Sequence, residues 1–181
     1  MSTTGHLFLQ SAIKRLSYYK DLGDKTFDQL SDVDFHYQPN EESNSIAIII
    51  QHMAGNMLSR WTDFLTTDGE KDWRNRDTEF EAQQLGKKEL LALWEKGWQC
   101  CLDAIQSLNE TDLLKTITIR GEGLPVVDAI NRQLAHYPYH VGQIIYVAKQ
   151  ITNHNWHSLS IEKNQSAVFN SNMNKKTNTG H

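Results

Sequence analysis

Four stretches of the chain repeat apolar residues at every third or fourth position, which is the period of an amphipathic helix. They cover about residues 5–30, 46–66, 90–108 and 124–151. Polar side chains at 41–45 precede the second stretch and suit a helix N-terminus, and Pro125 suits the first turn of the fourth. The pattern therefore predicts an all-α protein with four main helices.

The connections between the predicted helices are long. About twenty residues, 67–86, separate the second helix from the third, and loops of this length are often lids or binding segments. We therefore expect residues 67–86 to cover or border the functional site. Residues 116–120 alternate like a short β-strand before the turn-forming segment 121–123. Such crossovers argue against a simple up-down-up-down bundle, which needs only short loops.

Composition indicates one globular domain. The 181 residues are 39% hydrophobic and 22% charged, which is enough apolar material for one sizeable core. We assign this domain to residues 1–170. The remaining segment, 171–181, is rich in Asn, Lys and Thr, and we expect it to be a mobile tail.

Charge and hydropathy exclude two classes of partner. A formal net charge of -4 provides no basic field for nucleic acid. No apolar run approaches the roughly 20 residues of a membrane span, and the N-terminus lacks the pattern of a signal peptide. Cys100 and Cys101 are adjacent, which excludes a disulfide framework, and nothing nearby favours a reactive thiol. We expect a cytoplasmic protein that binds neither nucleic acid nor membrane.

The chain carries a pair of histidines, His136 and His140, four residues apart on the fourth predicted helix. Residues at this spacing lie side by side on a helix, so both rings can reach one metal ion. Eight histidines in 181 residues produce such a pair by chance roughly 0.3 times. The pair alone therefore leaves open a hydrogen-bonded core histidine, and the upstream His52 is the candidate third ligand.

Two segments around these histidines, 51–56 (QHMAGN) and 136–144 (HYPYHVGQI), resemble the DinB-like superfamily of four-helix metalloproteins. An uncharacterised DinB-like subfamily is similar to this chain at 56–64 (NMLSRWTDF), 68–71 (DGEK) and 74–81 (RNRDTEFE). The resemblance covers roughly residues 5–170. It implies a four-helix bundle of up-down-down-up topology, usually a homodimer, in which His52, His136 and His140 bind a divalent ion such as zinc or nickel.

The resemblance implies a class of activity without fixing one reaction. Characterised members of the superfamily transfer low-molecular-weight thiols such as bacillithiol, or isomerise maleylpyruvate with mycothiol. Three histidines without a fourth ligand on the same faces leave a coordination position open, which is typical of catalytic zinc. We therefore expect an enzyme that activates a thiol or water for an unknown small-molecule substrate. The alternative is a non-catalytic module in which the ion joins two helices.

Four further residues are candidates for contact with the ligands or the substrate. Asn56 and Gln143 lie one turn from a candidate ligand, where each either orients it or is an ordinary surface amide. Arg60 and Arg132 lie on the ligand-bearing faces, where a guanidinium can grip a carboxylate. Their alternative is an ion pair with an acidic residue, for which the candidates are Asp63, Asp77 and Glu81.

Pro138 departs from the superfamily pattern, in which alanine is more common at this position. A proline inside a helix removes one backbone hydrogen bond, here to Leu134, and kinks the helix. The kink would change the relative direction of the His136 and His140 side chains and so alter the geometry in which they can bind an ion.

Overall fold

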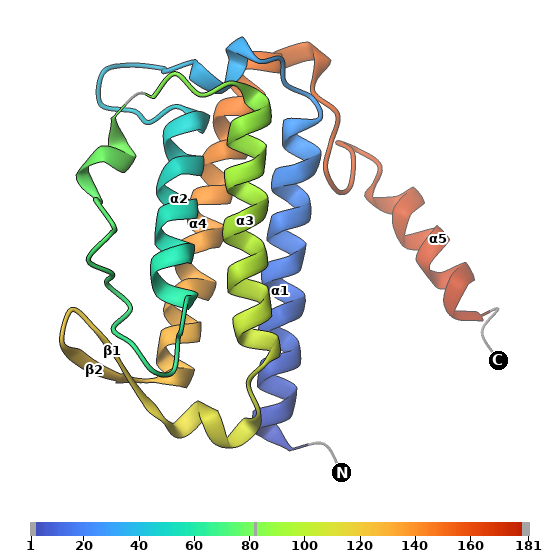
Figure 1. The fold of residues 1–181 in the computed structure, drawn as a ribbon. Helices are drawn as coiled ribbons and strands as arrows, with labels where there is room; N and C mark the ends of the chain where they lie inside the picture. Colours follow the sequence, from blue (N-terminus) through green and yellow to red (C-terminus); the bar gives the residue numbers. More distant parts are fainter. Residues whose placement is uncertain (1–2, 82, 179–181) are drawn as a thin grey trace.

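Four long helices form a bundle in the computed structural model, which describes residues 3–81 and 83–178. They are α1 (Thr4–Phe27), α2 (Ile46–Trp61), α3 (Lys87–Gln106) and α4 (Val126–Thr152). Helices α1 and α4 run in one direction and α2 and α3 in the other, so the order is up-down-down-up (Figure 1). The predicted fold class is confirmed.

Short elements fill the connections between the long helices. The strand β1 (Thr116–Ile119) confirms the predicted β-segment, and it pairs antiparallel with a second strand, β2 (Glu122–Pro125), which the sequence had not predicted. Arg120 and Gly121 form the turn with φ of 57° and 76°, as a tight hairpin requires. Single turns of 3-10 helix occur at η1 (Val33–His36), η2 (Asp77–Phe80), η3 (Glu110–Leu114) and η4 (Asn153–Asn155).

The end of α2 and the C-terminal segment differ from what the sequence predicted. Helix α2 ends at Trp61 rather than near Thr66, because Thr62 is extended and Asp63 has a φ of 50°. Phe64 continues the apolar pattern because its ring packs on Trp61 at 4.6 Å, although the chain has left the helix. A fifth helix, α5 (Ser166–Asn178), projects from the bundle where the pattern gave no helix (Figure 1). Its side chains at 166–172 are exposed, so no apolar stripe marked it.

Helix α2 is the central element of the bundle. Almost all of its residues are buried, because α3 and α4 pack on it and the crossover 62–86 covers another face. The Ser45 hydroxyl accepts a hydrogen bond from the N–H of Ile48 at 3.3 Å and so begins the helix. A Cβ on Gly97 of α3 would lie 3.0 Å from Cα of Ala54, so this glycine permits the close approach of α3 to α2.

The crossover 62–86 is attached both to α2 and to the hairpin. The Ser59 hydroxyl on α2 donates to the carbonyl of Gly69 at 2.7 Å. The Asp68 carboxylate accepts the backbone N–H groups of Arg120 and Gly121 at 2.8 Å each. These bonds hold the start of the crossover beside the β-turn, and the chain then runs back along α2 (Figure 1).

Helix α4 continues across Pro138, and its described residues form one element from Val126 to Thr152. Within the part of the chain that the structure describes, no helix is both long and apolar enough to cross a membrane.

Candidate metal centre

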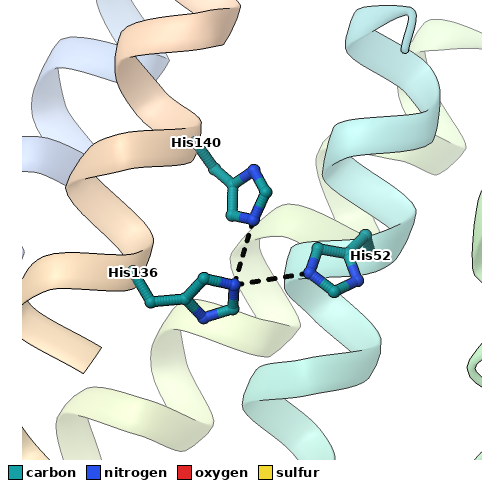
Figure 2. A group of neighbouring side chains, drawn as sticks. All are labelled: His52, His136 and His140. Atoms are coloured by element: carbon teal, nitrogen blue, oxygen red, sulfur yellow. Dashed lines mark hydrogen bonds between the residues drawn. The ribbon is translucent and has the colours of Figure 1, made fainter. Parts of the chain in front are cut away.

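Three imidazole rings meet between α2 and α4. Figure 2 shows His52 pointing from α2 toward His136 and His140, which project from successive turns of α4. The Nε2 atom of His136 lies 3.0 Å from Nε2 of His140 and 3.5 Å from Nε2 of His52. The three candidate ligand atoms all lie within 4.8 Å of one another.

These separations fit a single divalent ion. A tetrahedral ion with bonds of about 2.0–2.1 Å to nitrogen holds its ligand atoms about 3.3 Å apart. The two Nε2 separations of 3.0 and 3.5 Å bracket that value. The structure thus brings together the three histidines that the sequence named, and Pro138 does not prevent His136 and His140 from converging.

Each of the three rings has an oxygen at its outer nitrogen. Nδ1 of His52 lies 3.0 Å from Oε2 of Glu79. Nδ1 of His136 and of His140 lie 3.1 Å and 2.8 Å from the amide oxygens of Gln133 and Gln143. Because an ionised carboxylate can only accept, His52 donates its Nδ1 proton, and the two amide oxygens hold the other rings in the same way. All three Nε2 lone pairs therefore face the centre, as metal ligation requires.

The rings on α4 are neutral at physiological pH. Burial, together with the neighbouring rings of His140 and His52, lowers the pKa of His136 to about 3. Burial also lowers the pKa of His140, and this effect outweighs the hydrogen bond with Gln143 that favours the protonated ring. Neutral rings keep their lone pairs available, so His136 and His140 do not have to lose protons before they bind a cation.

Glu79 is an ionised, buried carboxylate. Burial alone would raise its pKa, but the hydrogen bonds from His52 and Arg74 outweigh burial and lower it. Arg74 donates from Nε at 2.7 Å and from Nη2 at 2.9 Å, so the guanidinium grips both carboxylate oxygens. Glu79 belongs to η2, the last turn in the crossover before α3.

The crossover borders the centre, as the sequence predicted from its length. The ring of Phe80 packs on His52 with 4.8 Å between centroids and 32° between the ring planes, and the guanidinium carbon of Arg76 lies over the Phe80 ring, 5.1 Å from its centroid. In the sequence, Phe80 directly follows Glu79, and Arg76 precedes Glu79 by three residues. One short segment therefore supplies both a hydrogen-bond partner and an apolar cover for His52.

The two amide candidates lie beside the centre in different roles. Gln143 holds His140 through its oxygen and donates from Nε2 to the hydroxyl of Tyr139 at 3.0 Å. Asn56 is buried and accepts from the hydroxyl of Tyr137 at 3.1 Å, and that hydroxyl accepts from Nε1 of Trp61 at 3.0 Å. Asn56 thus links α2 to α4 one turn away from His52.

The two arginine candidates are placed differently from each other. Arg60 is buried and donates to the carbonyl of Gly69 and, from both terminal nitrogens at 3.1 Å, to Glu70. Its acidic partner is therefore Glu70 rather than Asp63, Asp77 or Glu81. Arg132 is exposed, and its charge lies close enough to His136 to contribute to the lowered pKa of that ring.

Glu79 and Gln133 were not found from the sequence. Gln133 precedes His136 by three residues, just as Gln143 follows His140 by three, so this symmetry was a usable signal. No comparable signal marks Glu79, which lies 27 residues beyond His52 on an irregular segment. Burial raises the pKa of Cys101, so this thiol is a neutral core residue, as expected.

Comparison with known proteins identifies the family of the chain. The family described as "Protein of unknown function (DUF1572)" matches residues 3–165, and the chain belongs to this family. No curated protein matches the chain.

Proposed function

We propose that this member of the DUF1572 family is a DinB-like metalloprotein in which His52, His136 and His140 hold one divalent ion, zinc or nickel. The observation that carries the proposal is the set of three outer oxygens. Three histidines that happened to pack together would need a proton between their nitrogens, whereas here an oxygen acceptor beside each Nδ1 favours the proton on the outer side of every ring. That arrangement suits a cation at the centre.

The second part of the proposal is that the protein is an enzyme acting on a small molecule. Among the described residues, the group that can hold an ion contains the three histidines and no fourth His, Cys, Asp or Glu. A divalent ion with an open position is a Lewis acid that lowers the pKa of a thiol or water sharing it. The chain contributes the fixed ring orientations, and Phe80 covers one side of His52 against solvent.

A groove beside the centre provides a place for the substrate. It has a volume of about 740 Å³ and lies between the segment before α2 and the outer face of α4. Its lining includes hydrogen-bonding side chains, most of them uncharged, namely Asn40, Asn44, Tyr139, Gln143 and Tyr146, together with the acidic Glu42. Gln143 lines the groove and also holds His140, so a molecule bound beside Gln143 would be separated from this candidate ligand by one side chain.

Metal analysis tests the first part. The protein purified without a metal-chelating column should carry one divalent ion per chain, and replacement of His52, His136 or His140 by Ala should abolish it. His154→Ala is the matched control, because His154 is an exposed histidine on η4 and should leave the metal content unchanged. Full metal content in the three ligand variants would end the proposal.

Cobalt substitution separates the enzyme from the alternative, a non-catalytic module whose ion only joins α2 to α4. With an open position, a small thiol such as cysteine or an anion such as azide should change the visible spectrum of the cobalt protein. A spectrum that is indifferent to both additions would favour the non-catalytic module. A response to the thiol alone would support a low-molecular-weight thiol as the cosubstrate.

A further inference from the structure

The hydrogen bond to His52 comes from outside the four-helix bundle. Gln133 and Gln143 are on the same helix as the rings they hold, but Glu79 reaches His52 from the crossover. We propose that Glu79 is a positioning residue for His52 that fixes the proton on Nδ1 and thereby sets the metal affinity of the centre, and that Gly55 is the residue that admits it. This inference rests on the proposed metal site and adds to it the determinant of its affinity.

The bond between Glu79 and His52 is shielded from solvent. The two side chains are 9% and 7% exposed, and the carboxylate lies 3.0 Å from Nδ1. A hydrogen bond to a charged acceptor is stronger in such surroundings than in water. Three acceptors bond to the outer ring nitrogens, and of these Glu79 is charged whereas Gln133 and Gln143 are neutral amides. Glu79 therefore restrains its ring more firmly than the two amides restrain theirs.

Glu79 is itself held on its other side. The Arg74 side chain is 2% exposed and donates to both carboxylate oxygens, at 2.7 Å and 2.9 Å. The carboxylate oxygens therefore receive three donors in all, two from Arg74 and one from His52. Both oxygens must be acceptors for all three bonds to form.

Gly55 leaves the space that the carboxylate occupies. It lies three residues after His52 on α2, and a Cβ at this position would be 2.8 Å from Cδ of Glu79. Because Arg74 fixes the carboxylate, Glu79 cannot turn aside without breaking those bonds. A glycine inside a helix lowers helix stability, and here the absence of a side chain allows Glu79 to lie across α2.

The consequence concerns the proton of His52. The hydrogen bond made by one ring nitrogen determines which nitrogen is protonated. Without Glu79 the proton can move to Nε2, where it faces Nε2 of His136 at 3.5 Å and must be displaced before an ion can bind. Loss of the carboxylate should therefore weaken metal binding without removing any ligand.

Two substitutions test this from opposite sides. Glu79→Gln keeps the shape of the side chain but replaces one acceptor by an NH₂ group, which must face a donor of Arg74 or His52. Gly55→Ala keeps every charge and adds one methyl group where the carboxylate lies. The matched control is Gly142→Ala on α4, two residues from His140, where a Cβ would meet nothing within 4 Å.

The first readout is the affinity for Co²⁺, measured by competition with a chelator. Both Glu79→Gln and Gly55→Ala should weaken binding about 10- to 100-fold, the usual effect of losing a hydrogen-bond partner of a ligand. Gly142→Ala should bind Co²⁺ as tightly as the unchanged protein does, because no such partner is lost. Equal affinity in all four proteins would overturn the proposal.

The second readout is the position of the His52 proton in metal-free protein, from nitrogen–proton NMR of histidine-labelled samples. His52 should carry its proton on Nδ1 in the unchanged protein and in Gly142→Ala, and partly or wholly on Nε2 in the two test variants. A merely structural role for Glu79 would not move this proton. If either test variant fails to fold, as judged by circular dichroism, the other decides.

This second readout also separates the present inference from the proposed function. If the unchanged protein binds no metal but the proton moves as expected, the metal site fails and the positioning role of Glu79 stands. If the protein binds metal and the proton stays on Nδ1 in both variants, the metal site stands and the positioning role fails.

Discussion

Burial of neutral histidines makes the metal-free protein sensitive to acid. His136 has a pKa of about 3 in the folded chain, against about 6.5 for a solvated ring. The unfolded chain therefore binds more protons than the folded chain between these values, and stability falls as the pH drops below about 6.5. The stability that depends on a neutral His136 is fully present only above that pH.

The first prediction follows from this difference. After removal of metal with a chelator, the urea midpoint should be lower at pH 5 than at pH 7.5, and the difference should shrink in His136→Gln. His154→Ala should keep the full difference, because His154 is exposed. An undiminished difference in His136→Gln would show that other groups cause the acid sensitivity.

The second prediction concerns the hydroxyl of Tyr137, which joins Asn56 of α2 to Trp61 through two buried hydrogen bonds. Tyr137→Phe leaves one buried acceptor and one buried donor unpaired, so the free energy of unfolding should fall by about 1–3 kcal/mol. Metal content should not change. The exposed Tyr146 provides the comparison, and Tyr146→Phe should lie within about 0.5 kcal/mol of the unchanged protein.

At the level of single residues, the sequence predicts the candidate ligands better than it predicts the residues that hydrogen-bond to them. His136 and His140 share a helix, so their spacing fixes their relation before any tertiary structure is known. Gln143 follows from the same local geometry. Glu79 does not, because its approach to His52 depends on the path of an irregular segment and on the gap at Gly55. Arg60 was placed on the correct helix, but its partner Glu70 also lies on that segment.

At the level of elements, the crossover 62–86 and the β-hairpin behave as one unit. Asp68 accepts N–H groups from Glu70 at 2.7 Å and from Arg120 and Gly121 at 2.8 Å. The hydrogen bonds from Glu70 and Gly121 hold the pKa of the Asp68 carboxyl well below its usual range. Glu70, the next acidic residue, pairs with both Arg60 and Arg120. The two acidic side chains thus connect the crossover both to α2 and to the hairpin.

The third prediction is that Asp68→Ala loosens both segments together. The amide protons of Gly69, Arg120 and Gly121 should exchange faster with deuterium, whereas those of α3 should not change. Asp72 lies on the same crossover with an exposed side chain, so Asp72→Ala should leave all of these rates as they are. Faster exchange confined to the hairpin would show that the two segments move independently.

The long helices and β1 were predicted because each of them has one buried face. Helices α1 to α4 have apolar stripes because each packs on the bundle, and β1 alternates because Ile117 and Ile119 point inward. The side chains of α5 at 166–172 are all exposed, so the helix has no apolar stripe there and periodicity could not reveal it. The end of α2 was misplaced because Phe64 stays in the core after the backbone has turned. Periodicity records burial, and it marks a helix end only where burial also ends.

The fourth prediction, the homodimer, concerns the whole molecule and comes from the DinB-like resemblance. Light scattering after size exclusion should give about 42 kDa, twice the 20.8 kDa of one chain. A mass near that of one chain at micromolar concentration would contradict the prediction. The measurement should be made with and without metal, because the ion is proposed to bind within one chain and should not alter the mass.

The fifth prediction treats the ion as part of the stability of the whole fold. His52 belongs to α2 and the other two ligands to α4, so an ion bound by all three exists only when these helices are packed together. An ion that binds only the folded chain stabilises it by about 2.7 kcal/mol when its free concentration is 100 times Kd. Addition of zinc to the metal-free protein should therefore raise the melting temperature, and a chelator should reverse the rise.

The ligand variants show whether this stabilisation comes from the centre. His52→Ala removes the only ligand on α2, so zinc bound by the remaining pair would no longer join the two helices. Its melting temperature should not respond to zinc, while Gly55→Ala should respond only at higher zinc concentrations because its ligands remain. A rise of equal size in His52→Ala would place the stabilising ion elsewhere on the protein. Reversal by chelator in the unchanged protein alone would identify the ion as the link between α2 and α4.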